Sequence, residues 1–302
     1  MSTKSFTLKV AVLALTMGLA ASATAAEVSG TLAKIRDNNL IVLGYRESSI
    51  PLSYVDAGTN QVVGYSHEIA LRVVDAIKAE LNLPNLKVRE IPITAQNRIS
   101  LMQNGTIDLG CNGTTNNEAR RRQVAFSNTI AITETQLLTK KTSGIHDIAD
   151  LKGKSVAVTA GSTSEKFMRN YVHEKNMDTV VVSAKDHAQA FLMVQTNRAA
   201  AFFMDTDVLS SLIGQSPHPA DYIITGEPQT REALACMFRK DDPQFKAVVD
   251  KTIHDMQVSG AAAKLYNKWF MSPIPPDNKS LNVPLSADMK ALFAQPNDRS
   301  YN

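Results

Sequence analysis

Cysteine is scarce in this chain, and the familiar catalytic sequence motifs are missing. Two of the 302 residues are cysteine, and no pair of histidines lies near them, so the sequence contains no zinc-site pattern. The chain has no Gly-x-Ser-x-Gly elbow, no His-Glu-x-x-His and no phosphate loop ending in Gly-Lys-Ser/Thr. These absences argue against a hydrolase, a metalloprotease or a nucleotide-binding enzyme, and no cofactor is implied.

Long apolar runs are also few, and the one at the N-terminus has the form of a signal peptide. Lys4 and Lys9 precede the apolar stretch 10–21, and Ala23-Thr24-Ala25 fits a small-x-small cleavage site. We therefore expect residues 1–25 to be removed during export to the periplasm; the alternative is an uncleaved anchor or an amphipathic helix. No other stretch is long and apolar enough to cross a membrane.

The charge of the chain is nearly balanced once this segment is removed. Residues 1–25 contain two lysines and no acids, so 32 basic and 29 acidic residues become 30 and 29, a net charge of +1. There is no basic tract with interleaved aromatics, which argues against nucleic acid as a partner. The length of the mature chain favours two domains over one.

Short apolar runs alternate with helical patterns along the whole chain. Residues 40–46 and 86–91 have the pattern of buried strands, and 64–81 has an apolar helical face with Ser66 as its expected N-cap. In the second half, strands are expected at 155–159, 179–183, 200–204, 222–225 and 234–239, and helices at 162–175, 188–197 and 243–270. Such alternation predicts an α/β fold with largely parallel sheets.

Two extended segments, 136–141 and 233–239, bracket the compact middle of the chain. We expect them to be two hinge strands that join a discontinuous first lobe, residues 26–138 and 236–302, to an inserted second lobe, residues 139–235. Two crossing strands would allow the lobes to close around a ligand in the cleft between them.

The segment 93–115 contains two devices that bind a carboxylate. Arg98 begins a short helical stretch, and a guanidinium fits a carboxylate with two parallel hydrogen bonds. A strand is expected at 106–111, and Thr115 and Glu118 then form a capping-box pattern that predicts a helix N-terminus. Ser162 and Glu165 repeat the pattern after the strand 155–159. One helix N-terminus from each lobe would present N–H donors to an anion in the cleft. The alternative is that each box only starts its helix.

Three further polar residues lie at ends of expected elements, where ligands bind in open α/β sheets. Arg46 ends the first strand and suggests a second acidic group on the ligand, although it could pair with Glu47 instead. Asp205 ends a strand and could accept an α-ammonium group or cap the next helix. His187 begins a helix, where it could face an anionic group or stay solvated.

Several short motifs together resemble the periplasmic amino-acid-binding proteins of ABC uptake systems, and among them those that bind glutamate and aspartate. The resemblance covers nearly the whole mature chain. The motifs are GYRESS at 44–49, VGYS at 63–66, IPITAQNR at 91–98, QNGTID at 103–108, TTNN at 114–117, AKDH at 184–187, RKDDPQF at 239–245 and KWFMSPIPP at 268–276.

This resemblance implies the two-lobed type II periplasmic-binding fold and gives each site residue a role. Arg98 and Thr115 would hold the α-carboxylate with help from Thr163, and Asp205 would take the α-ammonium. Arg46 and His187 would face the side-chain carboxylate. The chain departs from its relatives at Ala95 and Gly113, where they often have serine, which leaves the choice between glutamate, aspartate and a related acid open.

The resulting hypothesis is a monomeric periplasmic protein that binds an acidic L-amino acid and delivers it to a membrane permease. The alternatives are a binding protein for another amino acid, an enzyme on the same scaffold such as a cyclohexadienyl-type dehydratase, and a ligand-independent interaction module. We also expect Cys111 and Cys236 to pair in a disulfide, since two exported cysteines commonly do so; the alternative is two separate buried thiols.

Overall fold

A computed structural model of the chain describes residues 27–301. The expected signal peptide, residues 1–25, lies outside this range. Within the described range, no helix has both the length and the apolar character needed to cross a lipid bilayer.

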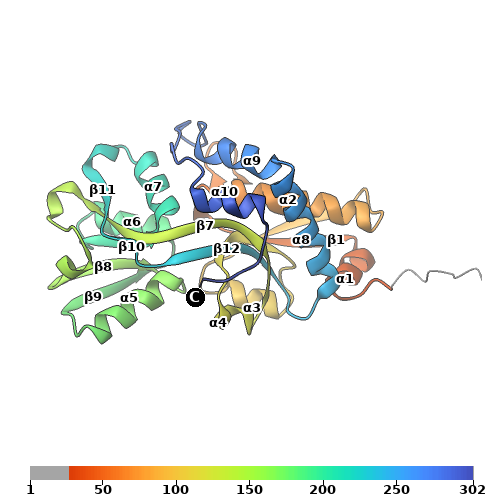
Figure 1. Ribbon diagram of the computed structural model, residues 1–302, viewed down its shortest axis with the longest axis horizontal. Coiled ribbons are helices and arrows are strands. Elements are labelled where there is room, and N and C mark those ends of the chain that lie inside the picture. Colours follow the sequence, from red (N-terminus) through yellow and green to blue (C-terminus); the bar gives the residue numbers. More distant parts are fainter. Residues whose placement is uncertain (1–26, 302) are drawn as a thin grey trace, which may run out of the picture.

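The elements gather into two bodies at opposite ends of the long axis, which we call the first and second lobes (Figure 1). The first lobe contains α1 (Gly30–Asn38), β1 (Leu40–Tyr45), β2 (Ser48–Ser49), β3 (Ser53–Asp56), β4 (Gln61–Val63), α2 (Tyr65–Glu80), β5 (Lys87–Pro92), α3 (Arg98–Gln103), β6 (Gly110–Thr115), α4 (Glu118–Arg121), α8 (Pro243–Val258), α9 (Ala261–Phe270) and α10 (Ala287–Ala294). The second lobe contains the α-helices α5 (Thr163–Glu174), α6 (His187–Gln195) and α7 (Thr206–Gln215), the strands β8 (Lys154–Thr159), β9 (Thr179–Ala184), β10 (Ala201–Asp205) and β11 (Tyr222–Thr225), and three short 3-10 helices at 141–143, 148–151 and 219–221.

Two long strands, β7 (Ala125–Lys140) and β12 (Arg231–Phe238), run side by side through the middle of the molecule (Figure 1). They belong to a sheet of order β6-β12-β7-β10-β8-β9, with β11 also paired to β7. The two-lobed α/β architecture expected from the sequence is therefore confirmed. The expectation of largely parallel sheets is confirmed only in part. β1 pairs parallel with β5, and β8 pairs parallel with β9 and β10, whereas β12 pairs antiparallel with β6 and β7, and β7 with β10 and β11.

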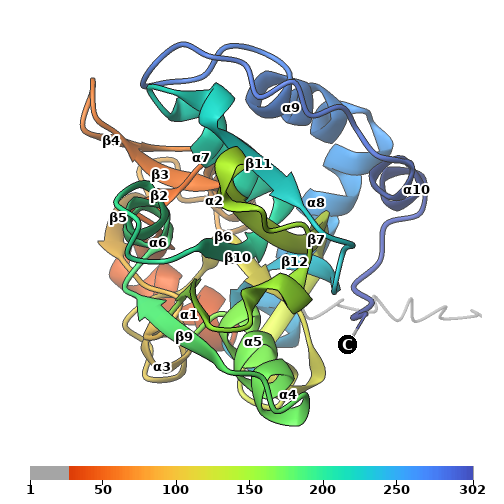
Figure 2. The ribbon, with the colours of Figure 1, turned by 90° about the vertical axis from the view of Figure 1, so that its left-hand side faces the viewer.

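The pairing of β7 changes partner partway along the strand. Residues up to Glu134 face β12, whereas Thr135 and later residues face β10. The lobe boundaries expected from the sequence, at 138/139 and 235/236, stay a prediction; we propose that the first crossing lies nearer Glu134. Seen from the end of the molecule, α5, α6 and α7 surround β10 in the second lobe (Figure 2).

Each lobe has its own apolar core, as amphipathic helices packed on a sheet require. In the first lobe, α2 buries Ile69, Val73, Val74 and Ile77, the face expected from helical spacing. Ser66 is not its N-cap: the helix begins after Gly64, and Ser66 lies buried in the first turn. Gly64 has φ +132° and lies where a Cβ would clash with the carbonyl oxygen of Leu52, so the chain enters the helix through a backbone geometry that needs glycine.

The strand expected at 106–111 lies four residues further along the chain. Residues 110–115 form β6, because Leu234 and Ala235 of β12 pair with Thr115 and Thr114. Thr115 is consequently a strand residue, and the helix N-terminus expected there does not exist. The helix α4 begins only at Glu118, with Asn117 as N-cap, and has four residues.

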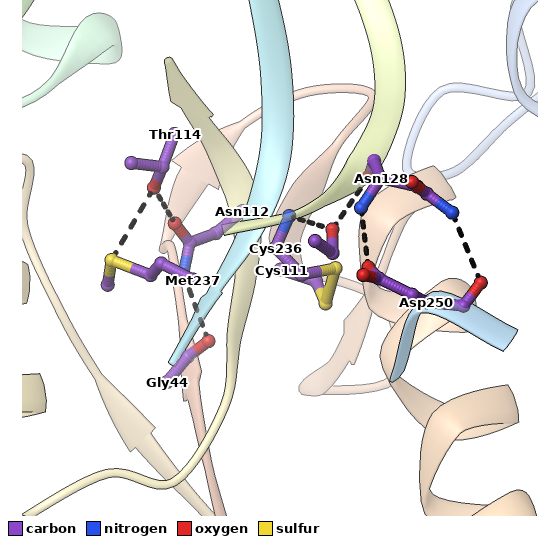
Figure 3. Close-up of a disulfide and its surroundings, with 9 residues drawn as sticks. Gly44, Cys111, Asn112, Thr114, Asn128, Cys236, Met237 and Asp250 are labelled. Atoms are coloured by element: carbon purple, nitrogen blue, oxygen red, sulfur yellow. Dashed lines mark hydrogen bonds between the residues drawn. A yellow bond between two sulfur atoms is a disulfide. The ribbon is translucent and has the colours of Figure 1, made fainter. Parts of the chain in front are cut away.

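A disulfide between Cys111 and Cys236 joins β6 to β12, which confirms the expected pairing (Figure 3). Both cysteines are buried, and the Cys236 N–H donates to Ser127 Oγ at 3.1 Å. The next residue of β7, Asn128, donates from its backbone N–H to Asp250 Oδ1 of α8 at 2.7 Å. The bond therefore lies where the central sheet of the first lobe meets its covering helix.

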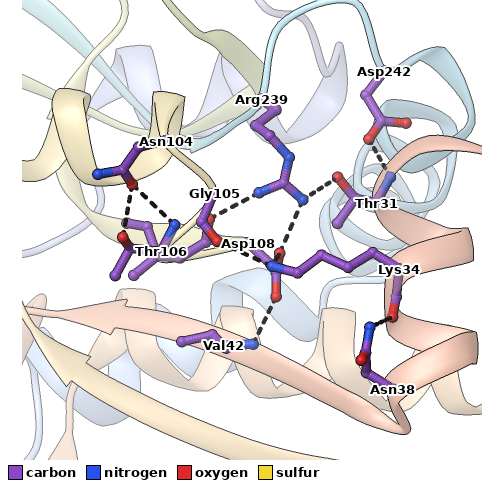
Figure 4. A network of polar contacts seen from close by, with 11 residues as sticks. Thr31, Lys34, Asn38, Val42, Asn104, Gly105, Thr106, Asp108, Arg239 and Asp242 are labelled. Atoms are coloured by element: carbon purple, nitrogen blue, oxygen red, sulfur yellow. Dashed lines mark hydrogen bonds and ion pairs between the residues drawn. The ribbon is translucent and has the colours of Figure 1, made fainter.

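A second polar network fixes the loop that follows α3 (Figure 4). The Asp108 carboxylate is fully buried; it accepts from Lys34 Nζ at 2.8 Å, Arg239 Nη2 at 2.9 Å and the Val42 N–H at 3.0 Å. A buried carboxylate needs such partners, and two cations here supply them. The network ties α1, β1 and the end of β12 to the loop that leads into β6.

Candidate functional site

A small cavity lies at the junction of the two lobes, and all seven site residues predicted from the sequence line it. Its wall comprises Arg46, Ser49, Leu52, Ala95, Arg98, Asn112, Gly113, Thr115, Ser162, Thr163, His187, Met204, Asp205 and Val208. Residues up to Thr115 come from the first lobe, and those from Ser162 come from the second. The strand ends and helix starts named in the sequence therefore meet in one place; which ligand group each residue contacts stays a prediction.

Two buried arginines supply positive charge to this cavity. Arg98, at the start of α3, is 3% exposed; its Nη1 donates to Thr114 Oγ1 at 2.9 Å, while Nε has no partner within the described residues. Burial, then the charges of Arg120 and Arg46, lowers the pKa of Arg98 well below its usual value. A guanidinium stays protonated in proteins, so an anionic partner would strongly stabilise this buried charge.

Arg46 follows β1 and is equally buried, with a pKa that burial lowers to about 10. Its Nη2 lies 3.5 Å from His187 Nε2, and His187 Nδ1 lies 2.7 Å from Thr159 Oγ1. Because an arginine can only donate, the imidazole accepts at Nε2 and donates from Nδ1 in this arrangement. Burial, then Arg46 and Arg98, lowers the pKa of His187 well below its usual value, so the ring is neutral at pH 7.

Asp205 is the only acid in the cavity wall. It ends β10 and occupies the N-cap position of α7, but its side chain makes no capping hydrogen bond. Its Oδ1 is buried and has no hydrogen-bond partner among residues 27–301. Burial, then the charges of Glu232 and Asp207, raises the pKa of this carboxyl well above its usual value, against the opposing effect of Arg98. The carboxyl is thus available to a cation placed in the cavity.

The start of α5 brings a helix N-terminus to the wall, as predicted. Ser162 is the N-cap and its Oγ accepts from the Glu165 N–H at 3.0 Å. The Glu165 carboxylate reaches back to the Gly161 N–H rather than to that of Ser162, so the capping box is displaced by one residue. Thr163, the first residue of the 12-residue helix, faces the cavity.

Gly113 has φ +73° in the middle of β6. A Cβ added there would lie 2.7 Å from Leu52 Cδ1. Both observations explain why a residue without a side chain occupies this position in the present backbone. Ala95, the second expected departure, is buried in the same wall.

Sequence reasoning missed two charged residues that adjoin the cavity. Glu232 of β12 is 1% exposed, and its Oε2 accepts from Thr115 Oγ1 at 2.5 Å and from Thr163 Oγ1 at 3.0 Å. Arg120 of α4 is also buried and donates to the Thr115 carbonyl at 3.0 Å and the Gly161 carbonyl at 3.4 Å. In the sequence, Glu232 could have been found as the single acid directly before the apolar run ALACMF. Arg120 had no such signal, because the three consecutive arginines 120–122 are typical of a solvent-exposed helix.

The charged residues that line the cavity leave a small excess of positive charge. Arg46 and Arg98 oppose Asp205, which leaves +1. A ligand that carries one net negative charge would neutralise the set. Since unpaired charges are costly away from water, the site favours an anionic or zwitterionic ligand with an excess acidic group.

Comparison with known proteins agrees with this geometry. Residues 41–272 match the family model of bacterial extracellular solute-binding proteins, family 3. The chain is 49% identical to the "Glutamate/aspartate import solute-binding protein" of Escherichia coli K12, with 96% of each chain covered. It is 47% identical to the "L-glutamate/L-aspartate-binding protein" of Pseudomonas aeruginosa, with 93% of each chain covered.

Solved structures share the same architecture. A mutant of the arginine-binding protein ArgBP of T. maritima superposes with a TM-score of 0.70 at 21% identity, over 80% of this chain and 99% of the other. At this identity the likeness concerns the fold, which is the two-lobed fold expected from the sequence.

Proposed function

Because this chain belongs to the bacterial extracellular solute-binding proteins of family 3, we propose that it captures an acidic L-amino acid, glutamate or aspartate, and delivers it to an ABC transporter permease. The observation that carries the acidic specificity is the pair of buried arginines opposite one aspartate in a closed cavity. A neutral amino acid would leave one of those cations without a counter-charge, whereas an acidic one provides two carboxylates and one ammonium.

The unpartnered atoms of the wall suggest the pose of the ligand. Arg98 at the start of α3, together with the N-terminus of α5 at Thr163, would bind the α-carboxylate. Asp205 would accept the α-ammonium. Arg46, oriented by His187, would bind the side-chain carboxylate. In this pose each charged end of the ligand meets an opposite charge from the wall.

The placement of these residues supports capture by closure of the lobes. Arg46 and Arg98 belong to the first lobe, whereas Asp205 and His187 belong to the second, so the pose needs both lobes. The crossing strands β7 and β12 provide two connections about which the lobes could close. We propose that the mature chain begins after residue 25, works as a monomer in the periplasm and presents its closed form to the permease.

We propose binding without turnover. An enzyme on this scaffold would need a general acid or base within reach of the ligand. Glu165 is held by the Gly161 N–H and by Arg169, so it takes no part. Asp205 faces the ammonium in the proposed pose. A ligand recovered chemically unchanged after long incubation with the protein would support binding alone; a converted ligand would favour an enzyme.

The test of this proposal is direct measurement with the mature chain after unfolding and refolding to remove any bound molecule. Mass spectrometry of the released material should identify glutamate or aspartate. Isothermal titration against all twenty amino acids should give saturable binding of these two at one site per chain. No binding of either acid, or tighter binding of a neutral or basic amino acid, would contradict the proposed specificity.

A further inference from the structure

Glu232 does not line the cavity, yet it connects the two walls that do. It lies on the crossing strand β12, where its register partner is Thr133 of β7. One carboxylate oxygen, Oε2, accepts from Thr115 Oγ1 of the first lobe and from Thr163 Oγ1 of the second. Both threonines line the cavity, and their hydroxyl oxygens lie 3.4 Å from each other. A single buried acid thus orients two hydroxyl groups contributed by different lobes.

The number of protons decides what these hydroxyls can offer to a ligand. A threonine hydroxyl has one proton and two acceptor lone pairs. If both hydroxyl protons are donated to Glu232, neither hydroxyl can donate to a ligand carboxylate. Each oxygen can then only accept a hydrogen bond from a ligand. An ammonium has three protons to donate and no acceptor. Two acceptor oxygens in the same wall as the Asp205 carboxyl therefore suit the α-ammonium, and the α-carboxylate is left to Arg98 and to the backbone N–H groups at the start of α5.

We propose, on the basis of the function proposed above, that Glu232 is a specificity-determining positioning residue: by accepting the Thr115 and Thr163 protons, it selects amino acids over dicarboxylates that lack an ammonium group.

The charge of Glu232 acts in the same direction. Glu232 adds one negative charge next to a wall that carries Arg46, Arg98 and Asp205. Removal of that charge makes the surroundings of the cavity more positive by one unit, which suits a dicarboxylate without an ammonium better than an amino acid. Glu232 also raises the pKa of Arg120 against the effect of burial and so offsets that cation. Proton direction and net charge both make the cavity selective for an ammonium-bearing ligand.

The test compares Glu232→Gln with wild type, using glutamate and glutarate, a dicarboxylate of the same carbon chain without the ammonium. Glutamine keeps the size of the side chain, but it has one acceptor oxygen and replaces the other with a donor. We expect the affinity for glutamate to fall 10- to 100-fold, and the ratio of glutamate affinity to glutarate affinity, each measured by direct titration, to fall at least tenfold.

The matched control is Glu134→Gln. Glu134 is an exposed acid on β7 that lies outside the cavity wall, and its register partner on β12 is Arg231. We expect the affinities of Glu134→Gln for glutamate and for glutarate to stay within twofold of wild type. Thermal unfolding of both variants separates a loss of folded protein from a loss of selectivity.

The outcomes distinguish this inference from the proposed function. Suppose that wild type binds glutamate, but that Glu232→Gln lowers the affinities for glutamate and glutarate equally or lowers neither. This outcome would overturn the role of Glu232 and leave the proposed function standing. An equal change in Glu134→Gln would overturn that role as well. If wild type binds another amino acid instead, the acidic specificity fails and the same variants are compared with that ligand and its counterpart without the amino group. Failure of wild type to bind any amino acid would overturn both.

Discussion

Arg46 and Arg98 are buried cations, and neither forms an ion pair with a carboxylate among residues 27–301. Arg98 bonds only to neutral oxygens, and Arg46 lies against a neutral imidazole. Their positions at the end of β1 and the start of α3 were readable from the sequence, because both follow recognisable strand or turn signals. Glu232 and Arg120 were not, because their importance depends on which strands pair, and sequence spacing does not give the pairing.

Replacement of Arg46 by alanine should change specificity more than overall binding. The side-chain carboxylate of glutamate would lose its only proposed cationic partner and be buried unpaired, which costs about 2–5 kcal/mol. We expect at least a hundredfold loss for glutamate, and less than a tenfold change for any neutral amino acid that binds detectably. Isothermal titration measures both.

Arg36→Ala is the control for this substitution, since Arg36 is an exposed arginine of α1 paired with Asp37. It should leave both affinities unchanged. Equal losses for acidic and neutral ligands in Arg46→Ala would show that Arg46 does not contact the side-chain carboxylate.

The raised pKa of Asp205 predicts that binding depends on pH. Only the ionised carboxyl attracts an ammonium, and a raised pKa means that ionisation requires a higher pH than for an ordinary aspartate. Glutamate affinity should therefore decrease as the pH falls through this raised pKa and level off above it. Titrations from pH 5 to pH 9 would show the slope, and Asp205→Asn should bind weakly with little slope. A wild-type pH dependence no steeper than that of Asp205→Asn would refute the assignment.

At the scale of elements, the sequence predicted most strands and helices but misplaced the one that matters most for the site. The apolar alternation of 106–111 predicted a strand, yet the ladder to β12 begins at Gly110, and β6 continues to Thr115, where a helix start was expected. Long-range pairing overrode local preference there. The start of α5 was predictable because the N-cap Ser162 acts locally, within one turn of helix.

Removal of that cap should weaken both the fold and the site. Ser162→Ala loses the bond to the Glu165 N–H and should reduce the free energy of unfolding by about 1 kcal/mol. Because Thr163 follows directly and faces the cavity, we also expect a three- to tenfold loss of glutamate affinity.

Ser286→Ala removes the equivalent cap of α10, where Ser286 Oγ accepts from the Met289 N–H; Ser286 does not line the cavity. It should cost similar stability with unchanged affinity. Denaturant unfolding and titration of the two variants separate these effects; equal affinities would show that the start of α5 does not contact the ligand.

At the scale of the whole molecule, two lobes share one central sheet, and the only covalent cross-link lies in the first lobe. The disulfide closes a loop of 125 residues that contains the entire second lobe. The insertion of the second lobe between residues 111 and 236 was expected from the two extended segments, whereas the mixed strand directions did not follow from composition or periodicity. The pairing of the two cysteines was predictable, because an exported chain with two cysteines has one way to form an internal bond.

Removal of this cross-link should destabilise the chain without changing its ligand. Closure of a loop of this length reduces the entropy of the unfolded chain by about 5 kcal/mol in the chain-entropy model, and measured losses are typically 2–5 kcal/mol. Cys111→Ala combined with Cys236→Ala should unfold at a lower denaturant concentration by that amount. Wild type unfolded in the presence of a reducing agent should have the same unfolding midpoint as the double variant. If oxidised wild type and the double variant unfold at the same denaturant concentration, the disulfide does not stabilise the fold.

The Cys111–Cys236 bond closes the chain segment that contains the second lobe into a covalent ring. A protease that cuts once anywhere between Cys111 and Cys236 would leave the two fragments attached to each other, so a nicked molecule would migrate as one species until its disulfide is reduced. A cut in the second lobe would thus not release that lobe from the first, and a damaged molecule would keep both halves of its binding cavity on one covalent assembly.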